Sequence, residues 1–197
     1  RGIRSWDDLA ECDPRRIGKI PGIRDLAIPK ARARALVEQR SILHSQHNLP
    51  LGVPLLFFDI ENDPIAELLD DSPAIYLWGF LYVSAENVPG DPRAVRASPF
   101  TESSIFAETP DGTGYRAAWE QAVAEIDRRL AAEPNLRIVH FADHEWNRIR
   151  DCADPGVYGA PERFVQRFHD ARIDLRNRVR DSAHLPTYGY GLKVVEK

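Results

Sequence analysis

The sequence contains no methionine, only two cysteines and no long apolar run. No stretch approaches the roughly 20 apolar residues that a membrane-spanning helix needs, and the first residues lack the apolar segment of a signal peptide. We therefore expect a cytoplasmic protein without a membrane partner. The missing methionine, absent even from the first position, predicts that these 197 residues belong to a longer, multidomain protein.

The scarcity of cysteine excludes two kinds of stabilising framework. Cys12 and Cys152 are far apart and fit neither a CxxC pair nor a Cys/His metal spacing. A disulfide framework or a structural zinc site is therefore not expected, and both side chains are predicted to be reduced thiols.

The chain also lacks a strong excess of one charge. A formal net charge of -4 argues against a protein that coats nucleic acid through overall positive charge, although a local patch can still bind. Hydrophobic residues make up 43% and charged residues 28%, which is typical of a globular protein with a packed interior. At 197 residues the chain can form one α/β domain with a small appendage, but not two full domains.

Residues 1–47 are predicted to form a small helical segment, because short apolar clusters occur at helical spacing without strand alternation. Within it, residues 17–24 resemble the hairpin of a helix-hairpin-helix module, whose turn contacts DNA phosphates without reading the base sequence. The resemblance implies nucleic-acid contacts for Lys19, Gly22 and Arg24. A plain Pro-Gly turn between two packed helices is an equally good interpretation.

Residues 48–197 are predicted to form the core domain, which begins after a Pro/Gly-bearing stretch at 48–54. The apolar and amphipathic patterns predict strands at 55–61, 74–83, 104–108 and 136–141, helices at 115–132, 143–152 and 162–171, and an extended element at 173–175. The order β-β-β-α-β-α indicates an α/β fold with a mixed sheet, in which three antiparallel strands precede parallel strands joined by crossover helices. Thr113 or Gly114 is expected to cap the first long helix.

Two carboxylates stand at the end of the first strong strand. Asp59 and Glu61 are two residues apart, so they project from the same face of the strand. Like charges at the end of an apolar strand favour a bound Mg²⁺ or Mn²⁺ ion, which prefers oxygen ligands. Alternatively, both acids are simply solvated where the strand enters a turn.

The Asp-x-Glu strand end resembles the first motif of the exonuclease branch of the ribonuclease H-like superfamily, the DEDD-type exonucleases. In that superfamily a later strand ends in a pattern like His-Asn-Ala-x-Phe-Asp, and residues 140–145 are similar to it. The resemblance places Glu145 at the metal-ligand position. Asp143 is the alternative ligand, although it also suits a helix N-cap. His140 and His144 are candidate transition-metal ligands, but structural hydrogen bonding is the commoner role for such histidines.

Further segments resemble predicted RecB-family nucleases that carry a ribonuclease H-like domain. Residues 76–79 are similar to their Tyr-Leu-x-Gly strand, and residues 173–175 and 190–196 to their Asp-Leu and Tyr-Ser-Leu-Lys segments. The resemblance makes Asp174 a further candidate metal ligand, although the aspartate of that segment usually supports the fold. It makes Lys193 a candidate phosphate contact, although a solvated helix lysine is the simpler interpretation. It covers nearly the whole chain but leaves out a last motif, Tyr-x-x-x-Asp or His-x-x-x-Asp, which would lie beyond Lys197.

The resemblance implies a two-metal nuclease with 3′-5′ exonuclease-like hydrolysis of nucleic acid, DNA rather than RNA, and Mg²⁺ or Mn²⁺ as cofactor. Asp59, Glu61 and Glu145 would be the catalytic metal ligands, with Asp59 bridging both ions. One alternative is a non-catalytic nucleic-acid-binding module with the same fold. A more distant one is an α/β transferase that uses Asp59 and Glu61, although no Gly-rich phosphate loop is present.

Overall fold

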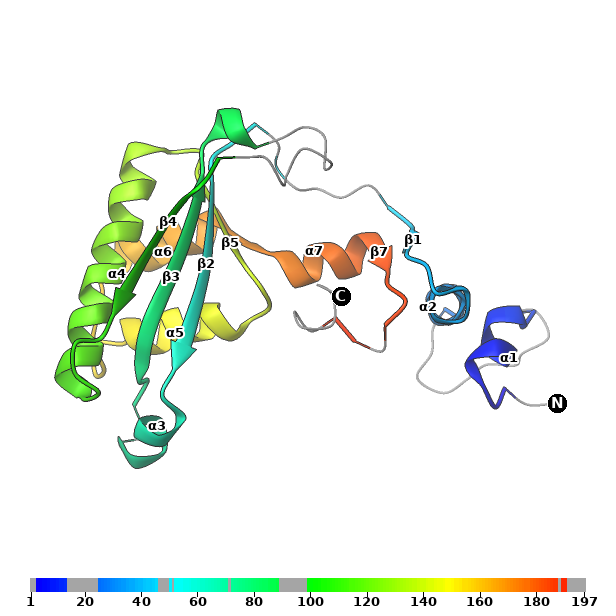
Figure 1. Ribbon diagram of the computed structural model, residues 1–197, viewed down its shortest axis with the longest axis horizontal. Helices are drawn as coiled ribbons and strands as arrows, with labels where there is room; N and C mark the ends of the chain where they lie inside the picture. Colours follow the sequence, from blue (N-terminus) through cyan, green and yellow to red (C-terminus); the bar gives the residue numbers. More distant parts are fainter. Residues whose placement is uncertain are drawn as a thin grey trace. The chain divides into compact units, whose positions relative to one another are not determined.

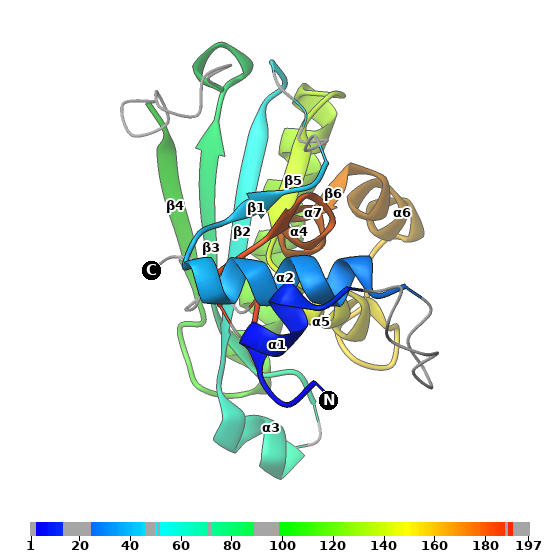
Figure 2. The same ribbon diagram turned by 90° about the vertical axis from the view of Figure 1, so that its right-hand side faces the viewer.

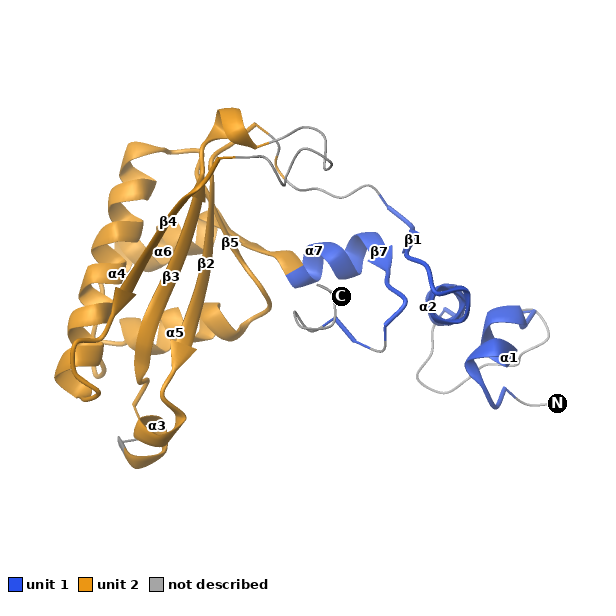
Figure 3. Cartoon of the chain, in the orientation of Figure 1, with its two compact units in different colours: residues 1–48, 176–197 blue, residues 49–175 orange. Residues whose placement is uncertain are grey.

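A computed structural model describes residues 3–13, 25–45, 50, 52–70, 72–88, 99–187 and 189–190. The chain divides into two compact units (Figure 3): residues 49–175 form one, and residues 1–48 together with 176–197 form the other. The division after residue 48 lies beside the expected boundary after residue 47, whereas residues 176–197 group with the N-terminal segment instead of with the core domain. In the described parts of the chain, no helix has the length and apolar character needed to cross a membrane.

The unit of residues 49–175 is built on a five-stranded mixed sheet (Figure 1). Its strands are β2 (Leu55–Asn62), β3 (Ile75–Val83), β4 (Thr101–Phe106), β5 (Arg137–His140) and β6 (Arg172–Asp174). Their order is β4-β3-β2-β5-β6, as seen from left to right in Figure 2. The first three are antiparallel, while β5 pairs parallel with β2 and β6 parallel with β5. The expected α/β class with a mixed sheet is confirmed.

Three helices, α4 (Gly112–Ala132), α5 (His144–Ala153) and α6 (Glu162–Ala171), lie against one face of this sheet (Figure 1). Strand alternation turns Leu56, Phe58 and Ile60 towards them, and all three side chains are buried. The core between helices and sheet is rich in aromatic rings, whose centroids lie 5.6 to 6.1 Å apart. Its aromatic members are Phe58, Trp78, Phe80, Trp119, Phe164 and Phe168.

The connection between β2 and β3 contains a helix that the apolar pattern did not predict, α3 (Pro64–Asp70). Asp63 caps it, since its Oδ1 accepts hydrogen bonds from the backbone N–H groups of Ile65 and Ala66 at 3.0 and 3.1 Å. Proline at the first helical position after an aspartate is a recognisable start signal. The signal is present in the sequence, but seven residues are too few to establish a helical period.

Two other details of this unit differ from the sequence expectations. The third strand covers 101–106 and so begins three residues and ends two residues earlier than expected, because its side chains are mostly exposed and show little apolar alternation. Helix α4 is capped by Asp111, and neither Thr113 nor Gly114 is the cap. Their backbone N–H groups instead donate to Asp111 Oδ1, both at 2.9 Å. A short 3₁₀ turn, η2 (Ala85–Asn87), follows β3.

The second unit contains α1 (Trp6–Glu11), α2 (Ala27–Glu38), β1 (Ile42–Leu43) and β7 (Ala183–His184), which follows α7 (Leu175–Ser182). Strands β1 and β7 pair antiparallel. Helices α1 and α2 contact each other, with Arg34 Nε donating to Ala10 O at 3.3 Å. Pro29 lies in the first turn of α2, where a missing N–H is tolerated. The expected hairpin, with Lys19, Gly22 and Arg24, lies outside the described residues, as does Lys193.

Candidate functional site

Asp59 and Glu61 lie near the end of β2 on the face of the sheet opposite α4, α5 and α6, here called the second face. Both residues are exposed, while the alternating Phe58 and Ile60 are buried in the core. Asp59 Oδ1 accepts a hydrogen bond from the Ile60 backbone N–H at 2.9 Å. The strand thus fixes the backbone of both acids and leaves their carboxylates directed away from the core.

Glu145 occupies the first turn of α5, immediately after the turn that follows β5. Only 6% of its surface is exposed, and its Oε2 atom is buried without a hydrogen-bond partner among the described residues. His140 Nδ1 lies 3.6 Å from that oxygen. A carboxylate oxygen in this state is costly unless a cation approaches it, although the N-terminal end of the helix dipole offsets part of the cost.

The charge of Glu145 influences the pKa of Asp59. Partial desolvation raises the pKa of Asp59, and the negative charges of Glu145 and then Glu61 raise it further. The hydrogen bond from Ile60 and the nearby His144 act in the opposite direction. Asp59 is thus exposed as a residue, yet its carboxylate lies within electrostatic reach of the buried Glu145. Clustered carboxylates with a raised pKa are a common feature of cation sites and catalytic sites.

The turn between β5 and α5 is held in an unusual backbone conformation. Ala142 has φ +72°, a left-handed conformation that costs energy for any residue with a Cβ atom. Both backbone groups of Ala142 are bound: its N–H donates to Asp174 Oδ1 at 3.1 Å, and its carbonyl accepts from His140 Nδ1 at 2.6 Å. These bonds fix the start of α5 and so the position of Glu145.

The structure therefore separates the expected site residues by role. Asp59 and Glu145 are brought within electrostatic reach of each other, and Glu61 adds its charge to Asp59. Asp174 instead supports the Ala142 turn. Asp143 occupies the N-cap position of α5, as its place in the sequence suggested, but its side chain makes no capping hydrogen bond.

The described residues fit a metal ion only in part. In the part of the chain that the structure describes, no group of three or more His, Cys, Asp or Glu side chains is arranged to hold a metal ion. However, the buried Glu145 oxygen that lacks a hydrogen-bond partner among the described residues lies within electrostatic reach of Asp59, and carboxylate oxygens are ligands of the kind that Mg²⁺ and Mn²⁺ accept. These two residues fit part of a metal site, and a further oxygen ligand is needed to complete it.

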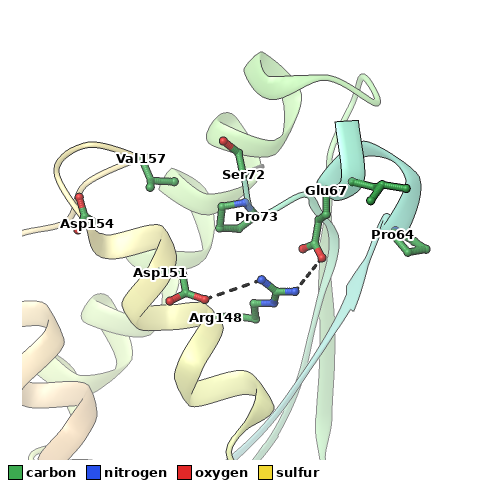
Figure 4. Close-up of a pocket in the computed structure, with 9 residues that line it drawn as sticks. Pro64, Glu67, Ser72, Pro73, Arg148, Asp151, Asp154 and Val157 are labelled. Atoms are coloured by element: carbon green, nitrogen blue, oxygen red, sulfur yellow. Dashed lines mark hydrogen bonds and ion pairs between the residues drawn. The ribbon is translucent and has the colours of Figure 1, made fainter. Parts of the chain in front are cut away.

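A separate hollow of about 600 Å³ lies between α3, the 72–73 connection and the end of α5 (Figure 4). Arg148 lies at its wall between two acids, with Nη2 2.7 Å from Glu67 Oε2 and Nη1 3.8 Å from Asp151 Oδ2. Because both charges flanking the guanidinium are negative, this arginine is already neutralised and is a poor anchor for a phosphate. Neither Asp59 nor Glu145 lines the hollow.

Sequence reasoning missed the features that link these residues in space. The left-handed Ala142 has no signal in a sequence, because alanine rarely adopts that conformation. The Glu67–Arg148 pair joins residues 81 positions apart, so no local pattern predicts it. No protein-family model matches the chain, and no curated protein matches it significantly.

Proposed function

We propose that this protein is a metal-dependent phosphodiesterase that acts on nucleic acid, with a ribonuclease H-like core. The observation that carries the proposal is the buried Glu145 oxygen without a hydrogen-bond partner in the described residues, within electrostatic reach of the carboxylate of Asp59. A protein that keeps an unpaired buried carboxylate oxygen gives up stability, which is expected where a cation is needed for function.

The strand arrangement supports the same proposal. The order β4-β3-β2-β5-β6, with three antiparallel strands and two parallel additions, is the arrangement implied by the resemblance to ribonuclease H-like nucleases. In this topology, adjacent parallel strands direct their carboxyl ends to one edge of the sheet. The end of β2 supplies Asp59 and Glu61, and the turn after β5 supplies Glu145. Acids distant in sequence therefore converge at one edge.

The chain's own residues have distinct tasks in this proposal. Asp59, Glu61 and Glu145 would hold Mg²⁺ or Mn²⁺, which supplies Lewis-acid stabilisation of the phosphate and activates water when bound. The desolvation and neighbouring charges that raise the pKa of Asp59 make that carboxylate responsive to a cation. Asp174 positions Glu145 indirectly, because it holds the N–H of Ala142 and with it the first turn of α5.

The second candidate function is a non-catalytic nucleic-acid-binding module with the same fold. It is favoured by the finding that the described residues contain no arrangement of three or more potential ligands. In that case Asp59 and Glu61 would be solvated acids at the end of a strand, and nucleic-acid binding would not depend on a divalent cation.

Manganese binding and cleavage distinguish the two functions. We expect the chain to bind Mn²⁺ in isothermal titration calorimetry and to cleave a labelled single-stranded DNA only when Mn²⁺ or Mg²⁺ is present. The substitution Asp59→Ala should abolish cleavage and weaken Mn²⁺ binding, while circular dichroism shows an unchanged fold. DNA binding without Mn²⁺ binding or cleavage would favour the non-catalytic module, and full activity in Asp59→Ala would refute the site.

A further inference from the structure

Gly79 lies in the interior of β3, between β2 and β4, and no structural need explains it. Glycine weakens a strand because it loses the most backbone freedom on folding and has no side chain to pack. Gly79 does not have a positive φ. Among the described residues, a Cβ atom at this position would meet the Asp59 carbonyl oxygen alone, at the ordinary contact distance of 3.7 Å. The backbone around Gly79 therefore leaves room for the Cβ atom of a larger residue.

Because Gly79 has no side chain, the row of residues to which it belongs is lower than its neighbours on the second face. Gly79 pairs with Asp59 on one side and with Ser104 on the other, so Asp59, Gly79 and Ser104 form a row across three strands, here called the low row. The low row contains no side chain larger than serine between Asp59 and the edge strand β4.

Larger side chains stand on both sides of the low row. One neighbouring row consists of Phe57, Leu81 and Glu102, and the other of Glu61, Leu77 and Phe106. The two flanking rows are four residues apart along each strand, which is roughly 13 Å between their backbones. Once their side chains are allowed for, this leaves a width suited to one extended chain. Ser104 and Phe106 are exposed at the outer end, Phe106 by 59%.

We propose that Gly79 controls access to Asp59, and that the low row is the path of a single strand of nucleic acid. This inference rests on the proposed nuclease function and adds a substrate path to it. The sugar-phosphate backbone would cross Gly79 to reach Asp59, and a base would stack on the exposed ring of Phe106. A double helix is too wide for a path that is bounded by two side-chain rows, so the preferred substrate is single-stranded.

The charge of the second face adds a requirement. Asp59, Glu61 and Glu102 all project from it, and all three repel phosphate. The strand is therefore expected to bind only when a divalent cation neutralises the inner acids. Binding that depends on a cation distinguishes this path from a basic surface, on which binding would be strongest without added salt or metal.

The experiment compares substitutions that fill the low row with one on the opposite face. The probe is a fluorescein-labelled thymidine 12-mer with phosphorothioate linkages, and binding is followed by fluorescence anisotropy in Mn²⁺. We expect Gly79→Val and Ser104→Val to weaken binding by about tenfold or more, the loss of one stacked base. Ser103→Val is the matched control, because Ser103 is also exposed on the same strand but pairs with the buried Phe80 and lies on the other face.

Two further readouts separate access from folding. Gly79→Val should unfold at the same temperature as the wild type or higher, because valine favours strands, and should keep its calorimetric Mn²⁺ binding. If Mn²⁺ binding or the fold is lost together with DNA binding, Gly79 has a structural role and the inference is wrong. If the wild type cleaves DNA and Gly79→Val binds it as tightly as the wild type does, the substrate path is wrong while the proposed nuclease function stands. If the wild type shows no Mn²⁺-dependent binding, the inference and the proposed function both fail.

Discussion

The buried carboxylate of Glu145 gives the most direct test, because its neutral isostere should be more stable than the wild type without metal and less stable with it. Substitution of Glu145 by glutamine keeps the size and shape of the side chain and removes the charge. The affected atom is Oε2, which is buried and has no hydrogen-bond partner among the described residues. Without metal, the substitution should therefore increase the free energy of unfolding.

The magnitude follows from three contributions. An unpaired buried polar group costs about 1–3 kcal/mol, and more when it is charged. The dipole of α5 offsets about 0.3–1 kcal/mol of the charge, since Glu145 lies in the first turn of that helix. The glutamine oxygen still lacks a partner, so only part of the cost is removed. We expect a net gain of about 1 kcal/mol, or a rise in Tm of about 2–4 °C for a chain of this size.

Bound Mn²⁺ should make the wild type more stable than Glu145→Gln, the reverse of the order without metal. At a free Mn²⁺ concentration of one hundred times Kd, a site that exists only in the folded state adds about 2.7 kcal/mol of stability. Glu145→Gln loses a charged ligand and most of that stabilisation. Wild type should then be more stable than the variant by about 1–2 kcal/mol, which is the difference between the two effects.

The assay is thermal unfolding followed by circular dichroism, once with EDTA and once with Mn²⁺. Glu162→Gln provides the matched control, because Glu162 also lies in the first turn of a helix, α6, but is exposed. That control should respond to Mn²⁺ as the wild type does. The reasoning is refuted if Glu145→Gln is less stable than the wild type in EDTA, or if Mn²⁺ stabilises both proteins equally.

Three other predictions test separate parts of the argument. The raised pKa of Asp59 means that its ionised form is disfavoured in the folded state, so the stability contribution of this group falls as pH rises above the ordinary value of 3.8. Asp59→Asn should therefore be slightly more stable than the wild type at pH 7, and the difference in urea midpoint should vanish below that value; a constant difference would contradict it. Asp174→Ala removes the acceptor of the Ala142 N–H and should lower the free energy of unfolding by about 1–2 kcal/mol, and also weaken Mn²⁺ binding, whereas Asp174→Asn should largely restore both. Burial raises the pKa of the Cys152 thiol to about 12, so a thiol reagent at pH 8 should label native protein at Cys12 alone, as peptide mass spectrometry would show.

The sequence predicted the core elements well where burial imposes a period. The run Leu55 to Ile60 and the helix at 162–171 were recognisable because apolar side chains must point to one interior. Where few side chains are buried, the observed elements differ from the predicted ones. Strand β4 has five exposed residues out of six, and α3 has exposed Leu68 and Leu69, so neither has a clear apolar period.

The candidate site was predicted as a set of acids, but not as an arrangement. Spacing alone places Asp59 and Glu61 on one face, since that follows from strand geometry. The environment of Glu145 depends on a left-handed alanine, Ala142, and on its hydrogen bond to Asp174 in β6, 32 positions further along the chain, which no local pattern contains. The supporting role of Asp174 agrees with the usual role of that aspartate in the resembling nucleases, whereas the burial of Glu145 and the bond between Ala142 and Asp174 could be identified only in the folded chain.

Those two roles give a physical criterion for distinguishing a supporting acid from a ligand. Asp174 has its carboxylate bonded to a backbone N–H at 3.1 Å, so its energy is lowered by the fold itself. Glu145 is more deeply buried, yet one of its oxygens has no such bond among the described residues, so a substantial stabilising interaction is missing from the protein alone. Metal binding would supply that interaction at Glu145 but would disrupt an existing one at Asp174. A cation should therefore bind first to Glu145 and Asp59, and it is there that loss of a carboxylate should weaken Mn²⁺ affinity most directly.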